Sequence, residues 1–131
     1  MQLSFRTLSM LTAGLCALLA LAWGFVPDRM LADWGIEYSL GVGLIARRTA
    51  VLFAALGLMF FLLRNQPPSA TRRALSNAFM VACWGLAVLG FGEWLNGHAG
   101  PGILLAVGVE LALGLAFFQA RHLSMEPETA G

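Results

Sequence analysis

The chain alternates between long apolar runs and short polar connections. The apolar runs cover about residues 7–26, 39–63, 74–95 and 102–120, and a polar tail follows at 121–131. Each run approaches the length of about 20 residues that a helix needs to cross a bilayer. Such runs form helices, because lipid offers no hydrogen-bond partner to an open backbone. The pattern predicts an all-α polytopic integral membrane protein, a single domain of residues 1–131 built as an antiparallel bundle of four transmembrane helices.

Composition supports this class. Of the 131 residues, 59% are hydrophobic and only 11% are charged, whereas a soluble domain is about 25% charged. The four spans leave no room for a soluble domain, and membrane lipids are the expected surroundings. A net charge of +1 argues against a nucleic-acid partner.

The first run resembles a secretory signal peptide only in part. Arg6 precedes it, but the apolar stretch from Leu8 to Val26 is longer than the usual core of a signal peptide and ends in no clean small-residue cleavage site. We expect a retained first span. Cys16 and Cys83 lie inside apolar runs and are expected to act as small apolar packing residues.

The arginines predict the orientation. Arg64, Arg72 and Arg73 share the second connection, and Arg6 and Arg121 fall on the same side of a four-span chain. Cytoplasmic segments carry an excess of basic residues, so both termini and the 64–73 connection should be cytoplasmic. Aromatic residues gather at the opposite ends of the spans, where we expect anchoring in the outer interface or, alternatively, stacking on a ligand: Trp23, Phe25, Trp34, Tyr38 and Trp94.

Small residues recur at helical spacing in every run, which lets helices approach closely in lipid. In the second run Arg47 shares such a stripe with Gly43 and Ala50. The last run carries two stripes, which predict contacts with two neighbours or with a second copy: Gly108, Ala112, Ala116 and Ala120 on one, and Ala106, Glu110 and Gly114 on the other.

Glu110 is the main candidate for chemistry, because it lies near the middle of an otherwise apolar run. An ionised carboxylate there costs about 2.5–3.5 kcal/mol on insertion scales and needs a partner, a proton or water. Arg47 lies at a similar depth and is the predicted partner, while Arg48 should snorkel outward. The pair can be a buried ion pair that fixes helix register. It can also mark a polar cavity for a headgroup, a proton or a small ligand, or the arginines can simply bind lipid phosphates.

The outer end of the third run holds a second candidate group, Glu93, Trp94 and His98. Glu93 and His98 can handle protons, but they offer too few ligands for a closed metal site, so no metal is expected. The alternative is plain anchoring at the interface. The chain shows no pairing of a nucleophile with a base, no phosphate-binding glycine loop and no cofactor motif. We therefore expect a protein without enzymatic activity and without a cofactor.

The segments around Arg47 carry a family resemblance. The sequence Ala46-Arg-Arg-Thr-Ala-Val-Leu-Phe-Ala-Ala-Leu-Gly-Leu and the basic segment 63–74, with Pro67 and Pro68, resemble small four-helix bacterial membrane proteins that are loosely DoxX-like. The likeness covers roughly residues 40–115. It implies the four-helix architecture and a multi-pass location in the bacterial inner membrane. The doubled Arg47-Arg48 and the central Glu110 depart from the group, which carries no defined activity to transfer.

Two functions fit these features best, ahead of a membrane enzyme that acts on lipid or quinone. The first is an accessory or assembly subunit that packs against a larger membrane complex or against itself. The second is a small-molecule or proton-coupled transporter that uses Glu110 as its titrating group. The absence of catalytic motifs and the many small-residue stripes favour the first.

The orientation can be tested with reporter fusions. One reporter placed after the C-terminus and another after Asn96 should report opposite sides of the membrane, with the C-terminus cytoplasmic, because the arginines share one side. Reporters on the same side would contradict the four-span topology.

Overall fold

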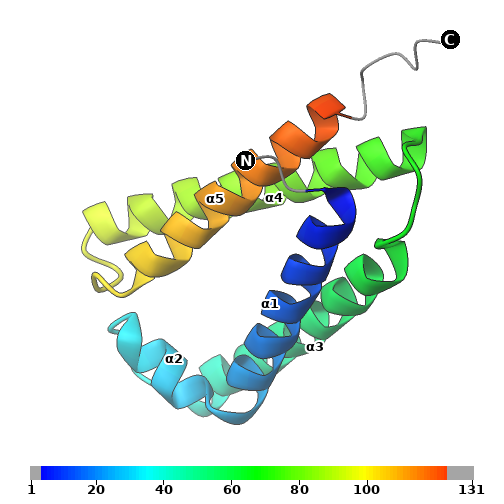
Figure 1. Ribbon diagram of the computed structural model, residues 1–131. Coiled ribbons are helices and arrows are strands. Elements are labelled where there is room, and N and C mark those ends of the chain that lie inside the picture. Colours follow the sequence, from blue (N-terminus) through cyan, green and yellow to red (C-terminus); the bar gives the residue numbers. More distant parts are fainter. Residues whose placement is uncertain (1–3, 124–131) are drawn as a thin grey trace, which may run out of the picture.

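The computed structural model describes residues 4–123. Its elements are α1 (Phe5–Phe25), α2 (Pro27–Asp33), α3 (Leu40–Leu63), α4 (Ala70–Leu95) and α5 (Ile103–Leu123) (Figure 1). In this part of the chain, the four helices other than α2 are long and apolar enough to cross a membrane. The prediction of an all-α protein with four spans is therefore confirmed. Residues 124–131 of the predicted polar tail lie outside the described part.

Serine residues start the first three spanning helices. The hydroxyl groups of Ser4, Ser39 and Ser69 accept hydrogen bonds from backbone N–H groups in the first turns of α1, α3 and α4. Such N-caps satisfy donors that a helix otherwise leaves open. The cap at Ser69 explains why α4 begins at Ala70, four residues before the predicted start at 74.

The short helix α2 lies in the stretch that the hydrophobic pattern marked only as a polar connection. Pro27 occupies its first turn, and Gly35 follows its end with a φ of 71°. The N–H of Gly35 bonds to the carbonyl of Ala32, and the N–H of Ile36 to that of Leu31. This double bond pattern is a Schellman motif, which needs a left-handed residue after the helix. Proline at the start and glycine past the end were the available signals.

Helices α1 and α3 form one antiparallel hairpin through a seam of small residues. A Cβ atom at Gly57 would lie 3.2 Å from the carbonyl oxygen of Ala13 and 3.3 Å from Cβ of Cys16. Nearer the other end, Gly24 faces Cβ of Ala50 at 3.6 Å. Backbones can come this close only where side chains are small, which is how helices associate in lipid.

Helices α4 and α5 form the second hairpin, in which glycines face larger side chains. A Cβ atom at Gly90 would lie 3.0 Å from Val107, and one at Gly114 would overlap the indole of Trp84. Each glycine provides the space that a bulky neighbour occupies. The α5 stripe that contains Gly114 is therefore used within the chain.

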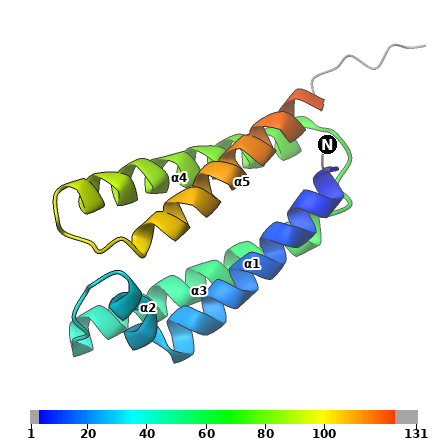
Figure 2. The same cartoon turned by 60° about the vertical axis from the view of Figure 1, so that its left-hand side comes forward.

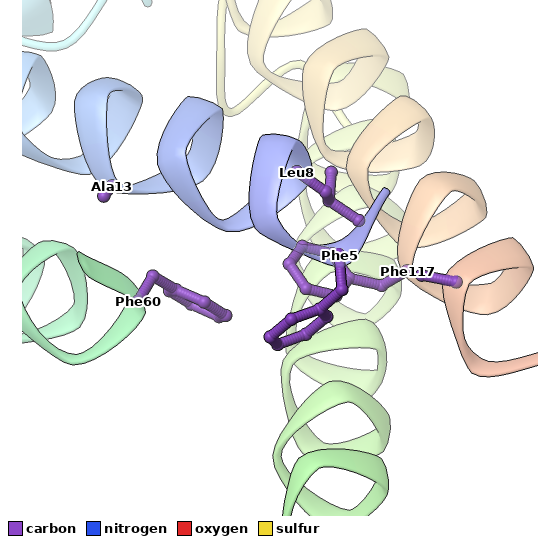
Figure 3. Packing of buried hydrophobic residues seen from close by; sticks show 6 residues of the cluster. Phe5, Leu8, Ala13, Phe60 and Phe117 are labelled. Carbon is purple, nitrogen blue, oxygen red and sulfur yellow. The ribbon is translucent and has the colours of Figure 1, made fainter. Parts of the chain in front are cut away.

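An aromatic cluster joins the two hairpins at one end of the molecule. Phe60 of α3, Phe79 of α4 and Phe117 of α5 contact one another, with ring centroids 4.7–5.4 Å apart. Phe5 and Leu8 of α1 complete the buried cluster (Figure 3). Four arginines also lie at this end, in the first turns of α1 and α4 and just after α3: Arg6, Arg64, Arg72 and Arg73. We call it the basic end.

Backbone contacts join the hairpins at the opposite end, the α2 end. The N–H of Gly100 donates to the carbonyl of Trp34 over 2.6 Å. A side chain at Gly102 would overlap the carbonyl of Asp33. Figure 2 shows α2 next to the connection between α4 and α5. The two hairpins are thus tied together at both ends.

The α1–α3 seam predicts that Gly57→Leu destabilises the protein. Overpacking of a tight contact costs about 1–3 kcal/mol, so the melting temperature in detergent should fall. Gly41→Leu is the matched control, because it lies on the same helix and a Cβ there meets nothing within 4 Å. Equal melting temperatures for the two variants would show that the seam does not limit stability.

Candidate functional site

A cavity of about 200 Å³ lies where the α4–α5 hairpin meets the connection after α2. Its walls are mainly apolar, with contributions from Leu86, Leu89, Ile103 and Val107. Trp34 and Ile36, from the connection between α2 and α3, also line it. Three residues that can carry charge complete the lining: Glu93, His98 and Glu110.

The end of α4 places His98 against Glu93. Gly97 has a φ of 77°, and its N–H bonds to the carbonyl of Trp94, while the N–H of His98 bonds to that of Glu93. This second Schellman motif turns the chain back over the last helical turn. As a result, Nδ1 of His98 lies 2.9 Å from Oε2 of Glu93.

The contact between His98 and Glu93 is partly open to the surroundings. The side chains are 65% and 42% exposed, and the contact is an ion pair only when the imidazole is protonated. An exposed pair of this kind contributes little to stability. Its relevance is chemical: it holds a proton-accepting imidazole and a carboxylate at the mouth of the cavity.

Glu110 reaches the same cavity from deeper in the membrane span. It follows Ile103 by seven residues on α5, which corresponds to about 10 Å along the helix. Ile103, Val107 and Glu110 follow one another at helical spacing and all line the cavity. The Glu110 side chain is half-buried, and among residues 4–120 it has no hydrogen-bond or ion-pair partner.

The structure does not bring Arg47 and Glu110 together, although the sequence predicts their pairing. Among residues 4–120, whose side chains the structure describes, the only ion pair is that of His98 with Glu93. Arg47 is exposed on α3, a helix of the other hairpin. The Glu110 carboxylate faces the cavity beside α4.

Helix geometry explains this error. The buried stripe of α3 contains Gly43, Ala46 and Ala50, and Arg47 lies next to it. Both Ala46 and Arg47 fit the spacing of three and four residues between Gly43 and Ala50. The seam uses the smaller one, because close approach in lipid favours small residues and an arginine there would be buried without a partner.

The remaining predicted residues lie outside the cavity. Arg48, like Arg47, is exposed on α3, as expected. Trp94 is half-buried and packs against Phe91, with ring centroids 5.7 Å apart. Of the residues expected at the outer interface, Trp34, Glu93 and His98 line the cavity.

The arrangement places groups that can exchange a proton or attract a cation in the lining of an apolar cavity. Among the residues that the structure describes, no group of three His, Cys, Asp or Glu side chains is placed to hold a metal ion. A carboxylate in an apolar wall can take up a proton or attract a small cation. The imidazole and carboxylate at the mouth could exchange protons with the aqueous side.

Sequence reasoning treated Glu110 separately from Glu93 and His98. Yet all three flank the same short turn between α4 and α5. Because the two helices run antiparallel from this turn, residues a few positions on either side of it come to lie near each other. The sequence signal that could have grouped them is the number of residues between each of them and this turn.

Comparison of the chain with protein-family models, with curated proteins and with solved structures finds no match. The likeness to DoxX-like proteins therefore gives no family assignment. What is shown is a four-span membrane protein.

Proposed function

We propose that this protein is a non-enzymatic accessory or assembly subunit, which packs against a larger membrane complex or against itself. The observation that carries the proposal is that α4 and α5 turn small residues outward. A Cβ atom at Gly85, Gly92 or Gly108 would meet nothing within 4 Å. Ala78 and Ala82 on α4 and Ala112 on α5 are likewise exposed.

These open faces contrast with the small residues that the chain uses for its own helix packing. Gly57, Gly90 and Gly114 each face a neighbouring helix of the same chain. In lipid there is no hydrophobic force between helices, and small residues contribute by allowing close packing. Small residues that pack against nothing within the chain are therefore suited to a helix from outside it.

Exposed arginines give independent support. Arg47 and Arg48 lie about 10 Å along α3 from its start at Leu40, and both are exposed. Intramembrane charges normally face a bundle interior or a water-filled cavity. An acidic or polar group on a partner subunit would provide that environment, and lipid phosphates are the alternative.

We further propose a location in a bacterial inner membrane, with both termini cytoplasmic. The support is the arginine excess at the basic end and the resemblance to DoxX-like proteins.

The assembly proposal predicts that Gly85→Leu and Gly108→Leu weaken association. The new side chains enter open space, so the fold is kept, but they block close approach of another helix. Blue-native electrophoresis and co-purification from native membranes in mild detergent should show a larger assembly for the wild type. A tenfold loss of association, about 1.4 kcal/mol, is expected for each variant.

Leu18→Ile serves as the control, because Leu18 is exposed on α1, which belongs to the other hairpin. An unaltered assembly in both glycine variants, or a wild-type protein that runs as a monomer, would contradict the proposal.

The cavity supports a second candidate function, proton-coupled or small-molecule transport through Glu110. The specific observation is that Glu110 is not neutralised by Arg47 and lines a cavity with Glu93 and His98. A titrating carboxylate at this depth is a common element of proton relays.

Transport predicts a flux that depends on Glu110. Protein reconstituted in liposomes with a pH-sensitive dye would be tested against cationic and neutral solutes. Glu110→Gln should lower a proton-coupled flux at least tenfold, because the amide cannot bind and release the proton. Glu37→Gln is the matched control, since Glu37 is exposed and does not line the cavity. If the wild type shows no flux, the transport function is contradicted and the assembly function remains.

A further inference from the structure

A second hollow lies on the α1–α3 hairpin and shares no lining residue with the cavity at Glu110. It is an open, apolar groove of about 620 Å³. The groove forms because small side chains leave this part of the surface recessed. At Gly14, for example, a Cβ atom would meet nothing within 4 Å. Larger apolar residues form its walls, among them Met10, Leu21, Leu58 and Phe61.

The length of the groove matches one leaflet of a bilayer. From Met10 to Leu21 it extends over twelve residues of α1, a rise of about 16 Å. The hydrocarbon core is about 30 Å thick, so the groove is about as long as one leaflet is deep. It begins about 8 Å along α1 from Phe5 at the basic end and extends past the middle of the helix. An acyl chain of one leaflet has this extent. A transmembrane helix of a partner would need a groove along the whole span.

Two arginines lie at the basic end of the groove. Arg6 precedes Met10 by one helical turn on α1, and Arg64 follows Phe61 by about one turn at the end of α3. The two arginines lie at the same depth in the membrane. Ala13 of α1 and Gly57 of α3 face each other, and Arg6 and Arg64 each lie seven residues, or about two turns, from this pair toward the basic end.

The Arg64 side chain is held at the groove. Its guanidinium carbon lies 4.0 Å from the centroid of the Phe61 ring, and Nη1 donates a hydrogen bond to the Phe61 carbonyl. Phe61 itself lines the groove. Within residues 4–120, neither Arg64 nor Arg6 pairs with a carboxylate.

We propose that this groove binds an anionic phospholipid of the leaflet at the basic end. The phosphate lies between Arg6 and Arg64, and one acyl chain occupies the groove along Gly14 and Phe61. Guanidinium groups suit phosphate because they offer several N–H donors in a planar array. Two cations without acidic partners favour a lipid with net negative charge over a zwitterionic one.

Charge also argues against a second copy of this chain as the occupant. A symmetric dimer brings the same patch of both subunits together. Across this groove, it would place Arg6 and Arg64 of each copy near their counterparts, and like charges in contact repel each other.

The test is native mass spectrometry of the full chain in mild detergent, titrated with phosphatidylglycerol or phosphatidylcholine. We expect one phosphatidylglycerol per chain to bind at least tenfold more tightly than phosphatidylcholine. Arg6→Gln and Arg64→Gln should each weaken phosphatidylglycerol binding about fivefold. Gly14→Leu should weaken both lipids, because it fills the groove.

Two controls match these changes. Arg73→Gln removes the same charge at the basic end but from α4, and Gly85→Leu adds the same side chain to the other hairpin; both should bind lipid like the wild type. Equal affinity for the two lipids, or equal losses in Arg73→Gln and the groove arginine variants, would overturn the proposal. A dimer that dissociates in Gly14→Leu would overturn it as well, since the occupant would then be a second copy.

Discussion

The contact between three phenylalanine rings at the basic end is the interaction on which the arrangement of the hairpins depends. Phe60 and Phe117 are 1% and 0% exposed, and with Phe79 they connect α3, α4 and α5. In lipid, apolar surface gains little by association, so shape-complementary packing of this kind holds helices together. At the opposite end, backbone contacts of Trp34 and Asp33 with Gly100 and Gly102 close the structure. The cavity lies on that side.

The helices of the two hairpins pack against each other in different ways. Between α1 and α3, small residues face each other and the backbones come close. Between α4 and α5, glycines at 90 and 114 receive Val107 and Trp84. The first arrangement leaves a shallow groove beside the seam, and the second leaves small residues free on the outer face. The surfaces proposed for lipid and for a partner helix are thus by-products of how each hairpin packs internally.

The spans could be predicted from sequence because lipid forces a long apolar run into a helix. The starts of α3 and α4 follow from Ser39 and Ser69, and the missed α2 had its own signals in Pro27 and Gly35. The pairing of Arg47 with Glu110 failed for a different reason. Depth along a helix can be counted, but the choice between Ala46 and Arg47 for the seam depends on which neighbour α3 faces. The grouping of Glu110 with Glu93 and His98 likewise depends on the register across a hairpin, which no local pattern states.

The junction at the α2 end has a consequence for how the protein can change over evolutionary time. It consists of main-chain groups at Trp34, Gly35 and Gly100, with Gly102 against Asp33. Only the glycines there are constrained by space. The two residues before Gly100, His98 and Ala99, line the cavity but make none of these backbone contacts between the hairpins. Substitutions can therefore change the side chains at the cavity mouth without disturbing the junction. Related proteins with the same helix arrangement could then differ in the ligands that enter the cavity.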